Sequence, residues 1–233
     1  NGVLKRTGLI SPRTNVYAPT QIGGGSYGYF SGKIDNVRVL SVPLTEAQVK
    51  EMMTEFCDEG TTLNGTYGHC NSDCTGMMPF CGDGQITSST GLVLNMQFEN
   101  NLVNENGTNG IDGAGAVTYT GGSPWGNAAV FNGSTYVSVA NYTAIENLKT
   151  FSVETWLKTN QTAPAGSAIP LVVKGSVTSL NYGLWLEPTG KVSFTFHGDA
   201  EGCGVHSATD MRGSVTRHVT GTFDNVTKKI QIY

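Results

Sequence analysis

Charged residues are scarce in this chain: they make up 14% of its 233 residues, and the formal net charge is only -4. No basic cluster stands out, so the sequence does not indicate a nucleic-acid partner. Long hydrophobic runs are also missing, and every apolar stretch is far shorter than the roughly 20 residues of a membrane-spanning helix. The sequence therefore predicts neither a nucleic-acid-binding protein nor a membrane span.

Catalytic motifs are missing as well. A glycosidase needs two carboxylates about 5 to 10 Å apart, and no such pair stands out in the sequence. Glu154 is the one acid on a predicted central strand, where it shares a face with Ser152 and Trp156. A solvated or groove-lining acid is favoured there over an acid catalyst. The glycines at 23–25 lead to no P-loop lysine, and we expect that the protein is not an enzyme.

Helical patterns are nearly absent, with one exception. Thr45 is followed three residues later by Gln48, which is the spacing of a capping box. Leu44 and Val49 occupy the positions of a hydrophobic staple around the same start. The pattern predicts one short helix over about residues 46–54.

Short β-type segments separated by turn residues fill most of the chain, which contains 31 glycines. From Leu92 the apolar residues alternate through Leu94 and Met96 to Phe98, the pattern of a half-buried strand. Further strands are expected at residues 128–131, 136–139, 151–157, 171–174, 182–186, 191–196, 218–223 and 229–233, and in the N-terminal part at 3–5, 21–22 and 32–40. Many short strands at this spacing predict an all-β sandwich or jelly roll.

The two ends of the chain match the two strands of one hairpin. The final strand contains Ile230 and Ile232, whereas the first residues give a turn followed by Val3 and Leu4. We expect these ends to share one sheet, completed either within one molecule or between two. An unpaired edge strand is a template for a partner strand, and head-to-tail contacts that do not close generate fibres. The ends therefore indicate assembly.

The cysteines are concentrated in one segment, at Cys57, Cys70, Cys74 and Cys81. This density predicts a linker with two internal disulfides in an oxidising, extracellular compartment. Zinc is the alternative, because His69 adjoins Cys70, but the C-x2-C spacing of common zinc sites is missing. The fifth, Cys203, is either a thiol or a bond to another chain.

Six Asn-x-Ser/Thr triplets permit N-glycosylation in a host that has the machinery, although an Asn- and Thr-rich chain also generates such triplets by chance. They begin at Asn64, Asn106, Asn132, Asn141, Asn160 and Asn225.

Several motifs resemble a known family. The segments 94–99, 129–133, 151–158 and 217–224 resemble the first two-thirds of a laminin G-like, concanavalin A-like jelly-roll domain. Residues 1–56, through Asn1-Gly2 and the segment 30–39, resemble the last third. Residues 57–84 look like the cysteine-rich repeats of large bacterial surface proteins. The resemblance implies a fold in permuted order: 1–56 and 91–233 form one jelly roll, joined by the linker 57–90. At ~3.4 Å per residue the linker could cross a domain, within one molecule or between two.

The same resemblance implies a calcium site and a glycan-binding surface. Asp35, Glu99 and Asn132 match the family's calcium-ligand positions, with Asn101 as a weaker addition; the alternative is that they close Asx turns. Aromatic rings able to stack on sugars are those of Trp125, Tyr142, Tyr182 and Trp185, although aromatics on strands more often belong to the core. Trp156 and Phe194 are expected in the interior.

Two functions compete. The first is an extracellular structural or adhesive protein, a repeating subunit of a filament or surface array whose laminin G-like domains are completed by strand sharing or tandem linkage, with copies of itself as head-to-tail partners. The second is a calcium-dependent carbohydrate- or matrix-binding module that forms no polymer. Filaments of purified protein favour the first, and glycan binding abolished by a chelator favours the second.

Overall fold

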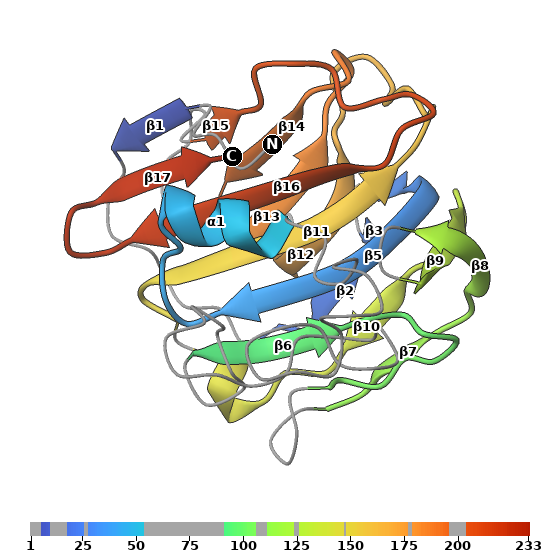
Figure 1. The fold of residues 1–233 in the computed structure, drawn as a ribbon, viewed down its shortest axis with the longest axis horizontal. Helices are drawn as coiled ribbons and strands as arrows, with labels where there is room; N and C mark the ends of the chain where they lie inside the picture. The colour runs from blue at the N-terminus through green and yellow to red at the C-terminus, as the bar shows by residue number, and fades with distance from the viewer. Residues whose placement is uncertain are drawn as a thin grey trace, which may run out of the picture.

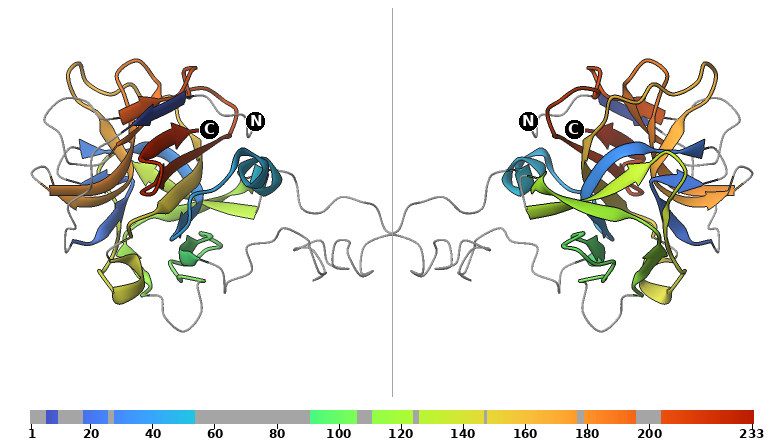
Figure 2. Two further views of the ribbon diagram at one scale, coloured as in Figure 1. Left: turned by 90° about the vertical axis from the view of Figure 1, so that its left-hand side faces the viewer. Right: turned by 90° about the vertical axis from the view of Figure 1, so that its right-hand side faces the viewer.

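The computed structural model describes residues 6–9, 18–25, 28–53, 91–105, 111–123, 126–146, 148–176, 179–195 and 204–233. These residues form two large antiparallel sheets, a two-stranded ribbon, one α-helix and one short 3-10 helix. The sheets pack face to face as the two layers of a sandwich (Figures 1 and 2). The fold is an all-β sandwich, as the alternating patterns predict, and it is consistent with the concanavalin A-like jelly roll that the resemblance implies.

The first sheet has the order β1-β17-β16-β11-β5-β9-β8, and β6 also pairs with β5. Its strands are β1 (Arg6–Leu9), β5 (Ser31–Leu40), β6 (Leu92–Met96), β8 (Thr118–Ser123), β9 (Gly126–Asn132), β11 (Phe151–Lys158), β16 (Arg217–Asp224) and β17 (Lys229–Ile232). The long strand β5 lies in the middle (Figure 1).

The second sheet has the order β15-β14-β13-β12-β2-β10-β7. Its strands are β2 (Thr20–Ile22), β7 (Gly113–Gly115), β10 (Val137–Val139), β12 (Ile169–Ser176), β13 (Ser179–Leu186), β14 (Val192–Thr195) and β15 (Gly204–His206). Strands β3 (Gly24–Gly25) and β4 (Gly28–Tyr29) form the separate ribbon, and the 3-10 helix η2 spans Thr143–Ile145.

The core lies between the two sheets, where alternate residues of each strand point inward. From β11 it takes Phe151, Val153 and Leu157, which are at most 1% exposed. Phe151 packs its ring within 6.0 Å of Phe194 of the opposite sheet. Gly221 leaves room for that ring, because a Cβ atom at this position would come within 2.2 Å of Phe194. The prediction that Phe194 lies in the interior is confirmed.

Helix α1 (Glu46–Met53) packs on the outer side of the first sheet (Figures 1 and 2). The capping box is present: the Gln48 amide N–H donates to Thr45 Oγ1, and the Thr45 N–H donates to Gln48 Oε1. Leu44 and Val49 form a small apolar cluster with Leu40 and the C-terminal Tyr233. The helix therefore covers the end of the chain that follows β17.

The expected strands are present wherever they fall on described residues, with shifted bounds. One difference concerns the alternation from Leu92: Leu94, Met96 and Phe98 enter the core, whereas Leu92 packs with the helix cluster. The pairing of β6 with β5 shifts register between Val39 and Leu40, which separates Leu92 from its neighbours' face. Strands β7, β8 and β15 were not predicted, because their sequences are short or rich in glycine.

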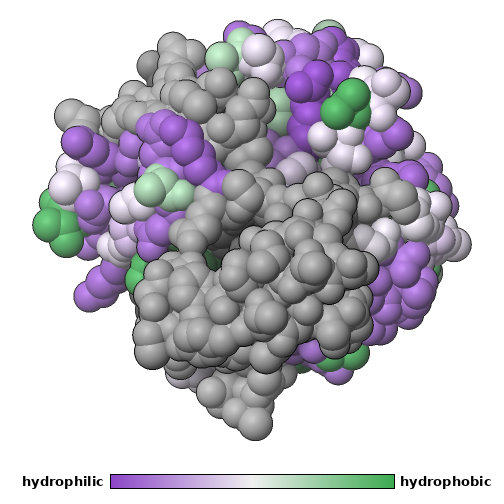
Figure 3. Space-filling view, in the orientation of Figure 1, coloured by the Kyte–Doolittle hydropathy of each residue, from purple (hydrophilic) through white to green (hydrophobic). Residues whose placement is uncertain are grey.

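The described part of the surface in Figure 3 is mostly hydrophilic, and its hydrophobic residues stand singly. Scattered apolar residues of this kind are normal on a protein surface. Among the described residues, no helix is both long and apolar enough to cross a membrane.

Candidate functional site

The N-terminal segment contributes strands to the middle of both sheets. Strand β5 lies between β11 and the strands β9 and β6, and β2 lies between β12 and β10. Without β2 the second sheet would fall into two pieces, and without β5 the first would fall into three, because among the described strands β6 pairs only with β5. The boundary between residues 18–53 and 91–233, here called the seam, therefore runs through the centre of the sandwich (Figure 1). Residues 18–53 and 91–233 thus build one sandwich, and the permuted order that the family resemblance implies stays a prediction.

The two ends of the chain also meet. Strand β1 pairs antiparallel with β17, with Arg6 opposite Ile232 and Gly8 opposite Ile230. The sequence predicted this pairing for Val3 and Leu4, which lie outside the described residues. The structure places the partner strand at Arg6–Leu9 instead. In this arrangement the edge of β17 is covered by the same chain.

Side-chain hydrogen bonds cross the seam at several points along β11. The Ser152 hydroxyl donates to Val42 O and accepts from the Leu44 amide, both at 2.8 Å. The Thr155 hydroxyl donates to Asp35 O at 3.0 Å. Each bond joins a strand of the C-terminal part to the backbone of the N-terminal segment, so the seam is held by more than its strand pairing.

An ion pair also crosses the seam on the outer face of the first sheet. Arg38 Nη1 of β5 lies 3.1 Å from Glu154 Oε1 of β11, and His218 Nε2 of β16 lies 3.5 Å from Glu154 Oε2. The Glu154 and His218 side chains are each 2% exposed. Glu154 is therefore buried rather than solvated. Trp156 packs beside His218, with ring centroids 4.9 Å apart, and is half-buried rather than interior.

The side chains of Arg38, Glu154, His218 and Thr220 are here called the polar row. Three of its buried polar atoms have no hydrogen-bond partner among the described residues. They are Glu154 Oε2, His218 Nδ1 and Thr220 Oγ1. An ion pair with such atoms beside it is costly to break, because removing one partner leaves an uncompensated buried charge. The polar row therefore couples β5, β11 and β16 energetically, and nothing in the sequence pattern pointed to Arg38 or His218 as members of it.

The structure brings together some of the predicted calcium ligands and separates others. The Glu99 carboxylate accepts the Asn127 amide N–H at 3.0 Å. Asp35 follows Ile34, which pairs with Ala129, so its backbone lies at the same part of β9. Asn132 lies five residues beyond Asn127 along β9, which is about 17 Å at the rise of a strand. The four predicted residues therefore do not form one ion site.

Asn132 and Asn101 close Asx turns, which was the alternative to calcium binding. Asn132 Oδ1 accepts the Ser134 amide N–H at 2.9 Å, and Asn101 Oδ1 accepts the Val103 amide N–H at the same distance. Ca²⁺ needs six to eight oxygen ligands. In the described part of the chain no group of three or more His, Cys, Asp or Glu residues is placed to hold a metal. The Glu99 carboxylate and the Asp35 backbone both lie beside the first half of β9, and calcium binding stays a prediction.

The aromatic residues proposed for sugar stacking are mostly interior. Tyr182 is 0% exposed and packs against Phe151, and Trp185 is 5% exposed. Neither ring can stack on a sugar in this fold, because stacking needs an open face. Tyr142 donates its hydroxyl to Val93 O and is half-buried, and burial raises the pKa of its phenol. Trp125 lies outside the described residues.

The cysteine predictions also fall outside the described residues. These are the linker cysteines and the separate thiol, that is Cys57, Cys70, Cys74, Cys81 and Cys203, together with His69. The disulfide, zinc and intermolecular alternatives stay predictions.

One shallow hollow lies where the two segments meet at the end of β5 and β11. It has a volume of about 500 Å³ and is lined by Lys33, Lys158, Asn160 and Gln161, among others. Lys33 and Lys158 are directly opposite each other on β5 and β11. Like charges in this position repel. Its lining thus carries two lysines, and both segments contribute to it.

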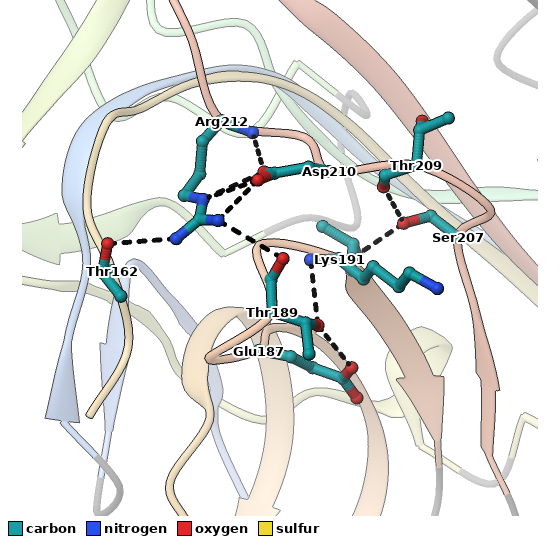
Figure 4. A network of polar contacts seen from close by, with 9 residues as sticks. Thr162, Glu187, Thr189, Lys191, Ser207, Thr209, Asp210 and Arg212 are labelled. Atoms are coloured by element: carbon teal, nitrogen blue, oxygen red, sulfur yellow. Dashed lines mark hydrogen bonds and ion pairs between the residues drawn. The ribbon is translucent and has the colours of Figure 1, made fainter. Parts of the chain in front are cut away.

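A second polar network holds loops at one end of the sandwich (Figure 4). Arg212 pairs with Asp210 and also donates to Thr162 Oγ1 at 3.0 Å and to Thr189 O at 3.4 Å. The hydrogen bonds from Arg212 lower the pKa of Asp210. Gly190 allows this packing, because a Cβ there would come within 2.1 Å of Asp210. The network ties three loops together.

Comparison with known proteins agrees with the fold. Residues 131–233 match a laminin G-like family model described as the concanavalin A-like lectin/glucanases superfamily. No curated protein and no solved structure matches the chain. The match covers β10 to β17 and the end of β9, and the unmatched strands β2 and β5 pair directly with strands inside the match.

Proposed function

Starting from its laminin G-like, concanavalin A-like sandwich, we propose that this chain is an extracellular adhesive and structural protein, in which the N-terminal segment can complete the sandwich of a neighbouring copy. Carbohydrate or matrix binding or adhesion is the general role that this fold suggests. The proposal adds that the sandwich is a joining device. Copies linked in this way are related head to tail, so they form an open filament or surface array.

The observation that carries the proposal is the position of β5 and β2. Both strands come from the N-terminal segment, yet they pair on both sides with strands of residues 91–233. A segment that fills the centre of two sheets leaves its acceptor incomplete until it inserts. Strand addition of this kind uses main-chain hydrogen bonds for affinity and side-chain pockets for specificity.

The linker length is compatible with insertion into the same molecule or into a neighbour. Residues 54–90 could extend to about 120 Å at ~3.3 Å per residue, which exceeds the width of one domain. The seam contacts are the same in both cases, because the donor and acceptor surfaces do not change. Exchange between copies therefore needs no new interface.

Disulfide trapping between two single-cysteine chains tests this proposal. Val39 of β5 lies opposite Val153 of β11. One chain carries Val39→Cys and a second, differently tagged chain carries Val153→Cys, and the two are refolded together. The expected result is a disulfide that joins the two differently tagged chains, together with filaments in electron micrographs. As a control, two differently tagged chains without the substitutions are refolded together, which shows any disulfide formed by the five native cysteines.

Trapping confined to a chain that carries both substitutions, with no polymer at any concentration, contradicts strand exchange. The protein would then complete its sandwich only within itself.

The second candidate function is a calcium-dependent carbohydrate- or matrix-binding module that forms no polymer. Two observations favour it: the hollow lined by Lys33 and Lys158, and the position of the Glu99 carboxylate and the Asp35 backbone beside the first half of β9. Binding of a glycan array by monomeric protein, lost on chelation, is the result that favours this candidate. We propose no hydrolytic role, and release of sugar from a polysaccharide by the purified chain would contradict that.

A further inference from the structure

A buried lysine, an asparagine and a glutamate meet beside the seam. Lys174 of β12 is 1% exposed, and its Nζ donates to Asn141 Oδ1. Asn141 lies in the loop after β10, and its Nδ2 donates to Glu146 Oε1. The three side chains therefore form one chain of contacts, from an amine through an amide to a carboxylate.

We propose that Lys174 and Asn141 form an intramolecular isopeptide bond, with Glu146 as the proton-transfer residue. The amine is a nucleophile, the side-chain amide carbon is its electrophile, and a carboxylate in contact with the leaving nitrogen is a suitable general acid and base. Nothing in the fold or in the family match assigns a covalent modification to these residues. The bond itself is inferred from these contacts, and only its biological role rests on the proposed adhesive function.

The reaction balances without an oxidant or a co-reactant. Neutral Nζ of Lys174 attacks Cγ of Asn141, and a new C–N bond forms as the carbonyl becomes tetrahedral. Glu146 takes a proton from the attacking nitrogen and gives it to Nδ2. The Cγ–Nδ2 bond then breaks and ammonia leaves. The products are one secondary amide and one molecule of ammonia.

The surroundings of Lys174 favour this chemistry. The residue lies opposite Thr20 on β2 and opposite Tyr182 on β13, and both are 0% exposed. The amine is thus held in place between buried residues of both neighbouring strands, with Asn141 Oδ1 as one of its acceptors. Glu146 is half-buried and Asn141 lies next to Tyr142, which packs against the core. A buried site also limits hydrolysis of an intermediate by water.

The position of the bond gives it a structural purpose. Strand β2 lies between β10 and β12 in the second sheet. A bond from Lys174 to Asn141 joins the strand on one side of β2 to the loop that follows the strand on the other side. Lys174 Nζ also donates to Ala18 O, at the entry to β2. The crosslink would clamp the inserted N-terminal segment, whichever copy supplies it.

Mass spectrometry of the intact, full-length chain tests the bond. We expect a mass lower than that of the sequence by about 17 Da, the mass of one ammonia molecule. Tandem spectra of a digest should contain one peptide pair that joins Lys174 to Asn141, and trypsin should no longer cleave after Lys174. Glu146→Gln keeps the size of the side chain but removes the proton carrier, so its chain should retain the full mass. Lys174→Met should retain it too.

Two controls distinguish the isopeptide bond from a different lysine crosslink and from succinimide formation. Lys149→Met removes an exposed lysine and should leave the mass loss unchanged. Asparagine that cyclises to a succinimide also loses ammonia, but it yields no joined peptides and persists in Lys174→Met. The proposal is overturned if the parent chain has its full mass, if the loss maps to a succinimide, or if Asn141 carries a glycan. The measurement is made on monomers and does not depend on filament formation.

Discussion

Ile34→Ala tests whether the N-terminal segment is part of the central core. Ile34 is 0% exposed in β5, with Leu157 of β11 opposite on one side and Ala129 of β9 opposite on the other. The substitution removes three buried carbon groups, worth about 2.4 kcal/mol at ~0.8 kcal/mol each. A residual cavity adds to this loss, so the total falls in the range of about 2 to 5 kcal/mol.

The assay is thermal or urea unfolding followed by circular dichroism. For a chain of this size each kcal/mol shifts the melting temperature by about 2 to 4 °C, so we expect a decrease of at least ~4 °C. Ile111→Ala is the matched control, because Ile111 is 41% exposed, and it should change stability by less than ~0.5 kcal/mol. If Ile34→Ala and Ile111→Ala behave alike, β5 does not pack in the core and the reasoning is refuted.

Three further predictions use the same unfolding assay. Arg38→Met should cost about 3 kcal/mol because it leaves buried Glu154 without its cation, and adding Glu154→Gln should recover part of that loss; simple additivity of the two changes would argue against coupling. Gly221→Ala should cost about 1 to 3 kcal/mol because its Cβ meets the Phe194 ring, and an unchanged stability would contradict the packing. A hydrogen bond from Thr227 is the main cause that lowers the pKa of Asp224. Its ionised form therefore stabilises the fold above about pH 4, and this stabilisation is lost as pH falls through the folded pKa. Asp224→Asn should lower the melting temperature at pH 7 but not near pH 2, and an equal decrease at both values would exclude this cause.

The sandwich could be predicted from the sequence because alternation at period two marks strands with one buried face. The residues Phe151, Val153 and Leu157 carry this signal clearly, and the capping box at Thr45 and Gln48 marks the one helix. Strands such as β7, a run of Gly, Ala and Gly, carry no such signal, because their pairing depends on neighbours that are distant in sequence.

The binding residues were harder to predict than the fold. Tyr182 is of a residue type that can stack on sugars, but its ring lies in the core. The sequence alone does not distinguish an exposed stacking ring from a buried one. The contacts of Lys174 with Asn141 and of Arg38 with Glu154 join residues that are 33 and 116 positions apart. Such pairs become visible only when the topology brings their strands together.

Hydrogen exchange of the backbone amides tests the central claim most directly, because exchange reports how firmly each strand is held. The account predicts that the amides of β5, residues 31–40, exchange as slowly as those of β11, residues 151–158, since the two strands pair in the centre of one sheet. Rapid exchange over residues 31–40 beside a protected β11 would contradict it, because the N-terminal segment would then not complete the sandwich.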